Sequence, residues 1–264
     1  MTFRILTTEP VPLLEPEEPP PYRVLEGDAD SPFFLTCDHA SNRLPKKLGD
    51  LGLAAAELER HIAWDIGAAG LSEALARELG GFLILQNYSR LAIDCNRPLS
   101  SETSITKTSE ATEIPGNRGL GSEQALARIA SIFEPYHRRI EHELARREQR
   151  GQSTVLLAIH SFTPVFHGVA RPWHVGVLYQ RDTRLAHALL QLLRSNSDLV
   201  VGDNQPYSVS DTSDYGIIQY GERRGLPHVE LEVRQDLITE PAQQTSWARR
   251  LAPMFRSALG MAGI

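Results

Sequence analysis

The chain is poor in cysteine, in surplus positive charge and in long apolar runs. Its 264 residues include only two cysteines, Cys37 and Cys95, which cannot form a disulfide scaffold and indicate a reduced, cytoplasmic protein. A net charge of −6 excludes the basic footprint of a nucleic-acid-binding protein. No apolar run reaches the ~18 residues of a membrane span, and the first residues lack the basic start and apolar core of a signal peptide. Neither a nucleic acid nor a membrane is therefore expected as a partner.

The composition is that of a globular protein with one region set apart. Hydrophobic residues make up 41% and charged residues 23% of the sequence, which suits a chain with a sizeable core. Residues 1–30 contain six prolines, and this predicts an extended arm along the surface rather than a helix or a central strand. No linker divides the rest, so residues 31–264 are expected to form a single domain.

Strands and helices are predicted to alternate after the arm. Short apolar runs predict strands at 33–36, 82–85, 154–159, 173–179 and 226–233. Helical composition predicts helices at 54–79, 122–150, 182–195 and 245–261, with Gly67 and Gly70 as breaks in the first and Pro135 as a kink in the second. The alternation predicts a three-layer α/β/α sandwich. Residues 99–121 form a long polar loop, which is often a lid or a binding loop.

Two predicted strands end in histidine, at His39 and at His160. Ligands of open α/β sheets collect outside the carboxyl ends of the strands, so the two rings are expected at one edge of the sheet. A catalytic zinc site needs three protein ligands and an open position for water, and two histidines with one carboxylate are a common set. Asp65 is the preferred carboxylate, and His61 and Asp38 are alternatives for the third ligand.

A second group of polar residues follows the strand at 82–85. Arg90, Asp94, Asn96 and Arg97 lie within eight residues. An arginine binds a carboxylate through a planar fork of N–H groups, so this density suits an acidic substrate. The alternative is a structural salt bridge between Asp94 and one of the arginines.

The predicted strand at 226–233 has a charged face. Strand alternation places His228, Glu230, Glu232 and Arg234 on one side. Charged groups on a core strand need partners or a water-filled cleft. A glutamate there can act as general base toward a zinc-bound water. The alternative is an edge strand with a solvated face.

Five segments, in order, resemble the N-formylglutamate amidohydrolase family. They are CDHASNRLP, WDIGA, YSRLAIDCNRP, LLAIHSFTP and HVELEVRQDLI, within residues 33–238. The family is similar to zinc carboxypeptidases and aspartoacylase. The resemblance implies their phosphorylase/hydrolase-like fold, with a central mixed sheet, and makes residues 31–264 a catalytic domain.

The resemblance also implies a role for most of these side chains. It places one zinc per chain on His39 and His160, with Arg90 near the scissile carbonyl. Glu232 becomes the base, chosen over Glu230 because the family's glutamate precedes a segment resembling Val233–Leu237. Asn96 and Arg97 are expected to bind the substrate carboxylate, and Asp94 and Ser161 are expected in the same substrate-binding set.

The chain departs from its relatives near His39. Zinc carboxypeptidases use a His-x-x-Glu pair, whereas the third residue after His39 is Asn42, so the acidic ligand must come from elsewhere, and Asp65 is preferred. Cys37 could face the same side as His39, but a thiolate ligand would differ from the family. The turn Cys-Asp-His-Ala-Ser replaces the Pro-His-Ser-Gly of members that degrade histidine, which leaves the exact substrate open.

The function implied is zinc-dependent hydrolysis of the amide bond of a small acidic N-acyl amino acid. N-formyl-L-glutamate, which yields formate and L-glutamate, is the first candidate. The alternatives are a deacylase or carboxypeptidase acting on another N-acyl amino acid or small peptide, and a non-catalytic binder of acidic metabolites. A monomer or a homodimer is expected.

Overall fold

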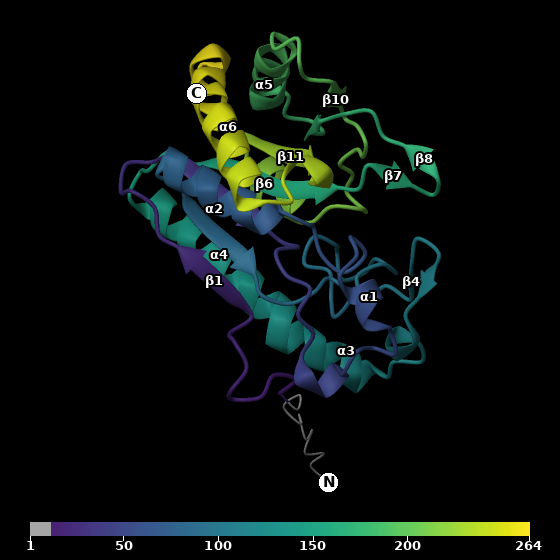
Figure 1. The fold of residues 1–264 in the computed structure, drawn as a ribbon. Coiled ribbons are helices and arrows are strands. Elements are labelled where there is room, and N and C mark those ends of the chain that lie inside the picture. Colours follow the sequence, from purple (N-terminus) through teal and green to yellow (C-terminus); the bar gives the residue numbers. More distant parts are fainter. Residues whose placement is uncertain (1–11) are drawn as a thin grey trace.

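A mixed sheet forms the centre of the molecule in the computed structural model, which describes residues 12–264 (Figure 1). Its seven strands, in spatial order, are β1 (Tyr22–Leu25), β3 (Phe82–Gln86), β2 (Phe33–Cys37), β6 (Val155–Phe162), β11 (His228–Arg234), β9 (Val175–Leu178) and β10 (Val201–Asp203). The inner strands β3, β2, β6 and β11 are parallel, whereas β1 and β9 run antiparallel to their inner neighbours. These parallel strands are almost wholly buried, as expected where helices cover both faces.

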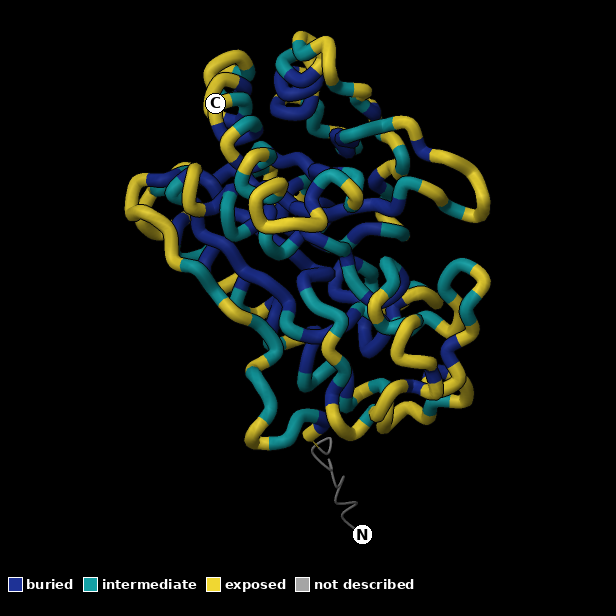
Figure 2. Tube along the Cα trace, viewed as in Figure 1, coloured by how far each residue is buried: buried dark blue, intermediate teal, exposed yellow. Residues whose placement is uncertain are grey.

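Helices cover the two faces of the sheet, so the predicted three-layer α/β/α sandwich is confirmed. On one face α2 (Ala68–Leu79), α5 (Arg184–Arg194) and α6 (Pro241–Ala262) pack against the sheet through residues such as Leu71, Leu189 and Phe255. On the other face lie α3 (Ser122–Arg128), α4 (Glu134–Gln149) and the π-helix η4 (Ile217–Glu222). Figure 2 shows the buried centre between them.

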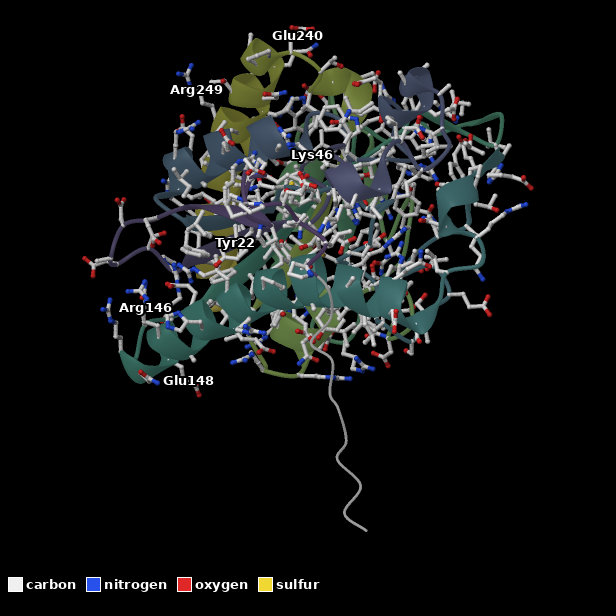
Figure 3. The ribbon with its side chains drawn as sticks, turned by 90° about the horizontal axis from the view of Figure 1, so that it is seen from below. Tyr22, Lys46, Arg146, Glu148, Glu240 and Arg249 are labelled. Atoms are coloured by element: carbon white, nitrogen blue, oxygen red, sulfur yellow. The ribbon has the colours of Figure 1, made fainter. Side chains whose placement is uncertain are left out.

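The outward faces of these layers are polar. Figure 3 shows Arg146 and Glu148 pointing away from α4, and Glu240 and Arg249 at the opposite side, on and just before α6. Among the described residues, no helix has both the length and the apolar character needed to cross a membrane.

The arm was predicted at residues 1–30. Its residues 1–11 lie outside the described residues. After the last proline of the arm, residues 22–25 form β1, which pairs with β3 at the edge of the sheet. This strand was not predicted. It forms where prolines stop, because each residue then has an N–H that can join the ladder.

The predicted helix at 54–79 is interrupted. It consists of α1 (Ala55–Leu58), turns, and then α2 from Ala68. Gly67 has a φ of +82°, and a Cβ there would lie 2.2 Å from the carbonyl oxygen of Ile238. The predicted break at Gly67 is confirmed, whereas the predicted break at Gly70 is wrong, because Gly70 lies inside α2. His61 and Asp65 lie in turns, not on a helix.

The predicted helix at 122–150 widens before its proline. A π-helical turn, Ile129–Phe133, joins α3 to α4. Pro135 has no N–H to donate to the preceding turn, so the wider spacing accommodates it.

Several short elements complete the chain. Residues 99–121 contain the hairpin β4 (Thr108–Ser109) and β5 (Thr112–Glu113), and a second hairpin, β7 (Val165–Phe166) and β8 (Val169–Ala170), follows β6. Both hairpins lie on the same side of the molecule (Figure 1). The remaining turns are the 3-10 helices η1 (Lys46–Leu48), η2 (Pro115–Asn117) and η5 (Gln235–Leu237).

Candidate active site

The charged residues singled out in the sequence meet at the carboxyl ends of β2, β6 and β11. His39 follows β2, and His160 lies inside β6, which continues to Phe162 beyond the predicted end of the strand. Glu232 on β11 lies directly opposite His160 in the parallel register. These side chains line a cavity of about 490 Å³. The position is the one at which open α/β sheets bind ligands.

His39, Asp65 and His160 form a buried cluster. The Oδ2 atom of Asp65 lies 3.3 Å from Nδ1 of His39 and 2.9 Å from Nδ1 of His160, and the ligand atoms of all three lie within 4.8 Å of one another. Burial raises the pKa of Asp65, but the two histidines outweigh it and hold that pKa below its usual value. Two imidazoles and one ionised carboxylate around a common point are a donor set that could hold a metal ion.

A carboxylate lies behind each histidine. Nε2 of His39 is 2.8 Å from Oδ1 of Asp94, and Nε2 of His160 is 3.7 Å from Oδ2 of Asp38. The Tyr136 hydroxyl donates to the other oxygen of Asp38. Such outer carboxylates fix the orientation of ligand histidines, with Nδ1 of each ring left to face the cluster.

Asp94, expected in the substrate-binding set, contacts other site residues. Its carboxylate accepts hydrogen bonds from His39, Arg90 and the backbone N–H of Asn96, and it is buried away from the cavity. These contacts fix Asp94 relative to His39 and Arg90.

The alternatives for the third ligand lie elsewhere. Asp38 is on the far side of the His160 ring from Asp65. His61 lines the cavity, but its Nε2 faces Glu110 at 3.3 Å. Cys37 points into the core under α2, where burial raises the pKa of its thiol far above the usual range.

Both glutamates of β11 face the cavity. β11 lies between β6 and β9, so the alternative of a solvated edge strand is wrong. Burial raises the pKa of Glu230 to about 7 and that of Glu232 well above its usual value, against the opposing effect of His160. Asp65 and Arg90 are among the charges that act on Glu232, whereas Asp214 and Arg97 act on Glu230. Glu232 is therefore the glutamate beside the histidine–aspartate cluster.

The two arginines line the cavity, and each has a carboxylate neighbour. Arg90 contacts Asp94 at 2.8 Å and Asp65 at 3.5 Å. Arg97 lies 3.9 Å from Asp214 and donates to the carbonyl of Ser213. The salt bridge considered for one arginine thus exists for Arg90, and a weaker pair exists for Arg97.

Asn96 and Ser161 stabilise the loops that frame the cavity. Oδ1 of Asn96 accepts hydrogen bonds at 3.1 Å from the backbone N–H groups of Tyr215 and Gly216. Ser161 donates its hydroxyl to the carbonyl of Ile66 and its N–H to Asp65. Both residues also line the cavity.

Several cavity residues were not predicted. Phe162 ends strand β6, and the others come from loops and from the two small hairpins, among them Ser109, Glu110, Phe166, Tyr207 and Asp214. Most of these loop positions show no regular spacing in the sequence by which they could have been identified. Phe162 alone could have been found, because it lies two residues beyond His160 and shares its face of the strand.

Comparisons with known proteins agree with this geometry. A profile of the N-formylglutamate amidohydrolase family matches residues 31–239. A gene product of Agrobacterium tumefaciens has a similar solved structure, with a TM-score of 0.92 and 34% identity over 96% of this chain and 100% of that chain. The N-formylglutamate amidohydrolase of Ralstonia eutropha JMP134 shares the fold, with a TM-score of 0.64 and 19% identity over 92% and 97% of the two chains. The search of curated proteins returned no match. The chain belongs to the N-formylglutamate amidohydrolase family, and it is a hydrolase that acts on an amide bond.

Proposed function

We propose that the enzyme is a zinc-dependent amidohydrolase of acidic N-acyl amino acids, and that N-formyl-L-glutamate is hydrolysed to formate and L-glutamate. The observation that carries this proposal is the buried His39–Asp65–His160 cluster, which shares one cavity with Glu232 and Arg97. The site thus combines a metal-binding donor set, a buried carboxyl and a cationic group.

The donor set fits a zinc ion. His39, Asp65 and His160 would hold it, because the Nδ1 atoms of both rings and a carboxylate oxygen face one point and the Nε2 atoms face Asp94 and Asp38. When bound, zinc supplies Lewis acidity toward a carbonyl and toward a water molecule.

Glu232 is the proton carrier of this proposal. It lies opposite His160 in the register of β11 and β6 and lines the cavity, so its carboxylate is placed to take a proton from the attacking water and to return it to the leaving nitrogen. Water thereby adds across the C–N bond, with the hydroxyl on the acyl carbon and the proton on the amine. Arg90, held by Asp94 and Asp65, directs an N–H toward the carbonyl oxygen that gains negative charge.

Arg97 and Asn96 form the anion-binding end of the site. Arg97 is partly exposed to the cavity, and its pairing with Asp214 at 3.9 Å is loose enough for a substrate carboxylate to compete. We place this site in a single catalytic domain, residues 31–264, of a cytoplasmic enzyme.

Formate release from N-formyl-L-glutamate tests the proposal. The purified protein should release formate and glutamate in equal amounts, lose this activity after dialysis against a chelator, and regain it with added zinc. Activity that survives complete metal removal would contradict the zinc assignment. Binding of the compound without hydrolysis would instead favour the non-catalytic binder.

A further inference from the structure

The cavity extends past the metal-binding cluster to an aromatic wall, which consists of Phe162, Phe166 and Tyr207. Phe162 follows His160 on the same face of β6, roughly 7 Å farther along the strand. Phe166 comes from the hairpin β7–β8, and Tyr207 comes from the loop after β10. The wall thus lies on the mouth side of the cluster.

Arg171 holds the aromatic wall together. Its guanidinium carbon lies 4.4 Å from the ring centre of Phe166, 4.8 Å from that of Tyr207 and 6.0 Å from that of Phe162. It also donates a hydrogen bond to the Tyr207 hydroxyl at 2.9 Å. Arg171 is 9% exposed, and no carboxylate of the described part of the chain pairs with it. Its guanidinium therefore contacts the ring faces and the Tyr207 hydroxyl, which joins the three rings into one surface.

The opposite end of the cavity is polar. Glu230 lies one pleat before Glu232 on β11 and opposite Ala158, whereas Phe162 lies opposite Arg234, one pleat beyond. Arg97, which acts on Glu230, marks the polar end. Along the strands, the anion-binding end therefore comes first, the metal-binding cluster second and the aromatic wall third.

This order fixes how a substrate lies, if the proposed function holds. A carboxylate on Arg97 and an amide beside His160 direct the acyl group toward Phe162 and the rest of the wall. A formyl group ends at the amide itself and leaves these rings without a partner.

The size of the cavity also favours a substrate larger than N-formyl-L-glutamate. Its volume of about 490 Å³ lies within the ~300–1,000 Å³ of clefts that take drug-sized ligands. N-formyl-L-glutamate is much smaller. Val169, the partner of Phe166 across the hairpin, is 68% exposed and continues the apolar surface outward.

We propose that the aromatic wall is an acyl-binding subsite and that the preferred substrates are N-acyl acidic amino acids with an aromatic or long aliphatic acyl group. N-formyl-L-glutamate is then the smallest member of the substrate class. This proposal rests on the amidohydrolase function, and it adds a specificity that the metal-binding cluster alone does not provide.

A series of N-acyl-L-glutamates tests the proposal, with acyl groups from formyl through acetyl and hexanoyl to phenylacetyl and released glutamate as the readout. The zinc-loaded wild type should show a kcat/KM for hexanoyl or phenylacetyl at least ~10-fold above that for formyl, the scale of a filled apolar pocket. Phe166→Ala should reduce this ratio by ~10-fold or more. Phe166→Trp, which fills the subsite, should also reduce it.

Val165→Ala is the matched control. Val165 lies on the same strand as Phe166, points to the other side of the hairpin and is 48% exposed, so its loss should leave the ratio unchanged. A wild type that prefers formyl, or a Phe166→Ala ratio equal to that of the wild type, would overturn the acyl subsite and leave the amidohydrolase function intact. Failure to hydrolyse any member of the series would instead overturn the proposed function.

Discussion

Acidic groups surround both histidines of the cluster: His39 contacts a carboxylate oxygen at each ring nitrogen, whereas His160 hydrogen-bonds to one at Nδ1 alone. Nδ1 of His39 and Nδ1 of His160 face Asp65, while Nε2 of each ring faces a second carboxylate. The His39 ring therefore has little freedom to turn, and the His160 ring is oriented through Nδ1. Glu232 and Glu230 have no such fixed partner, since the Oε2 atom of each makes no hydrogen bond within residues 12–264. A buried carboxyl without a partner is the group best placed to exchange a proton with a substrate or water.

The exchange of a proton by Glu232 can be tested by Glu232→Gln. This variant should keep the fold and the metal and lose ~10²–10⁴ in kcat, the usual contribution of a general base. Glu230→Gln is the matched comparison, because Glu230 is also buried and has a raised pKa. Near-normal turnover of Glu232→Gln together with a large loss in Glu230→Gln would assign the proton transfer to Glu230.

At this scale, the sequence reveals residues on strands better than residues that pair across the fold. His39 and His160 were found because each follows an apolar run, and Glu232 because strand alternation gives it a face. The ion pair of Arg97 with Asp214 joins residues more than a hundred positions apart, and no local pattern predicts it. No local pattern predicts the position of Asp94 behind His39 either, because the two residues are far apart in the sequence.

At the scale of elements, the helix layer beside the site depends on a buried polar contact. His137 of α4 hydrogen-bonds through Nδ1 to the Tyr220 hydroxyl of η4 at 2.8 Å, and its ring packs on Phe133 and Tyr215. Burial lowers the pKa of His137 to about 3 from a usual 6.5. The histidine is therefore neutral in the folded protein at neutral pH.

This histidine should make stability depend on pH. Between about pH 3 and 6.5 the unfolded chain binds a proton at His137 that the folded chain does not, so stability is complete above this window and falls as the pH is lowered into it. The free energy of unfolding in urea should fall by about 2 kcal/mol more for the wild type than for His137→Gln between pH 7 and pH 5. An equal decrease in both proteins would show that His137 is not the source.

The elements found from sequence are those whose pattern is local. The strands near 33–36, 82–85 and 154–159 are continuous apolar runs, and the sequence showed them at nearly the observed positions. The helix predicted at 54–79 was divided at Gly67 but not before it, where residues 59–66 form turns, and the approach of Gly67 to the carbonyl of Ile238, far along the chain, has no local signal. The hairpins β4–β5 and β7–β8 have strands of two residues, too short for any periodicity.

At the scale of the whole molecule, the two hairpins meet across the mouth of the cavity. The Glu110 carboxylate, in the turn of β4–β5, contacts Arg60 at 2.6 Å and accepts a hydrogen bond from the backbone N–H of His167, in the turn of β7–β8, at 3.3 Å. The loop at 99–121, predicted as a lid or binding loop, thus contributes Ser109 and Glu110 to the rim. Strand β6 provides His160, the turns after β2 and before α2 provide His39 and Asp65, and the hairpin loops line the rim of the cavity.

The proposed activity depends on a metal ion at His39, Asp65 and His160. Elemental analysis of the purified protein and its variants tests this most directly, with circular dichroism to confirm that each variant is folded. We expect about one zinc per chain in the wild type and in His61→Ala, whose ring lies in the same cavity outside the cluster. His39→Ala and His160→Ala should each lose most of the zinc, and Asp65→Ala should bind it more weakly. Undiminished zinc in both folded histidine variants would contradict the account.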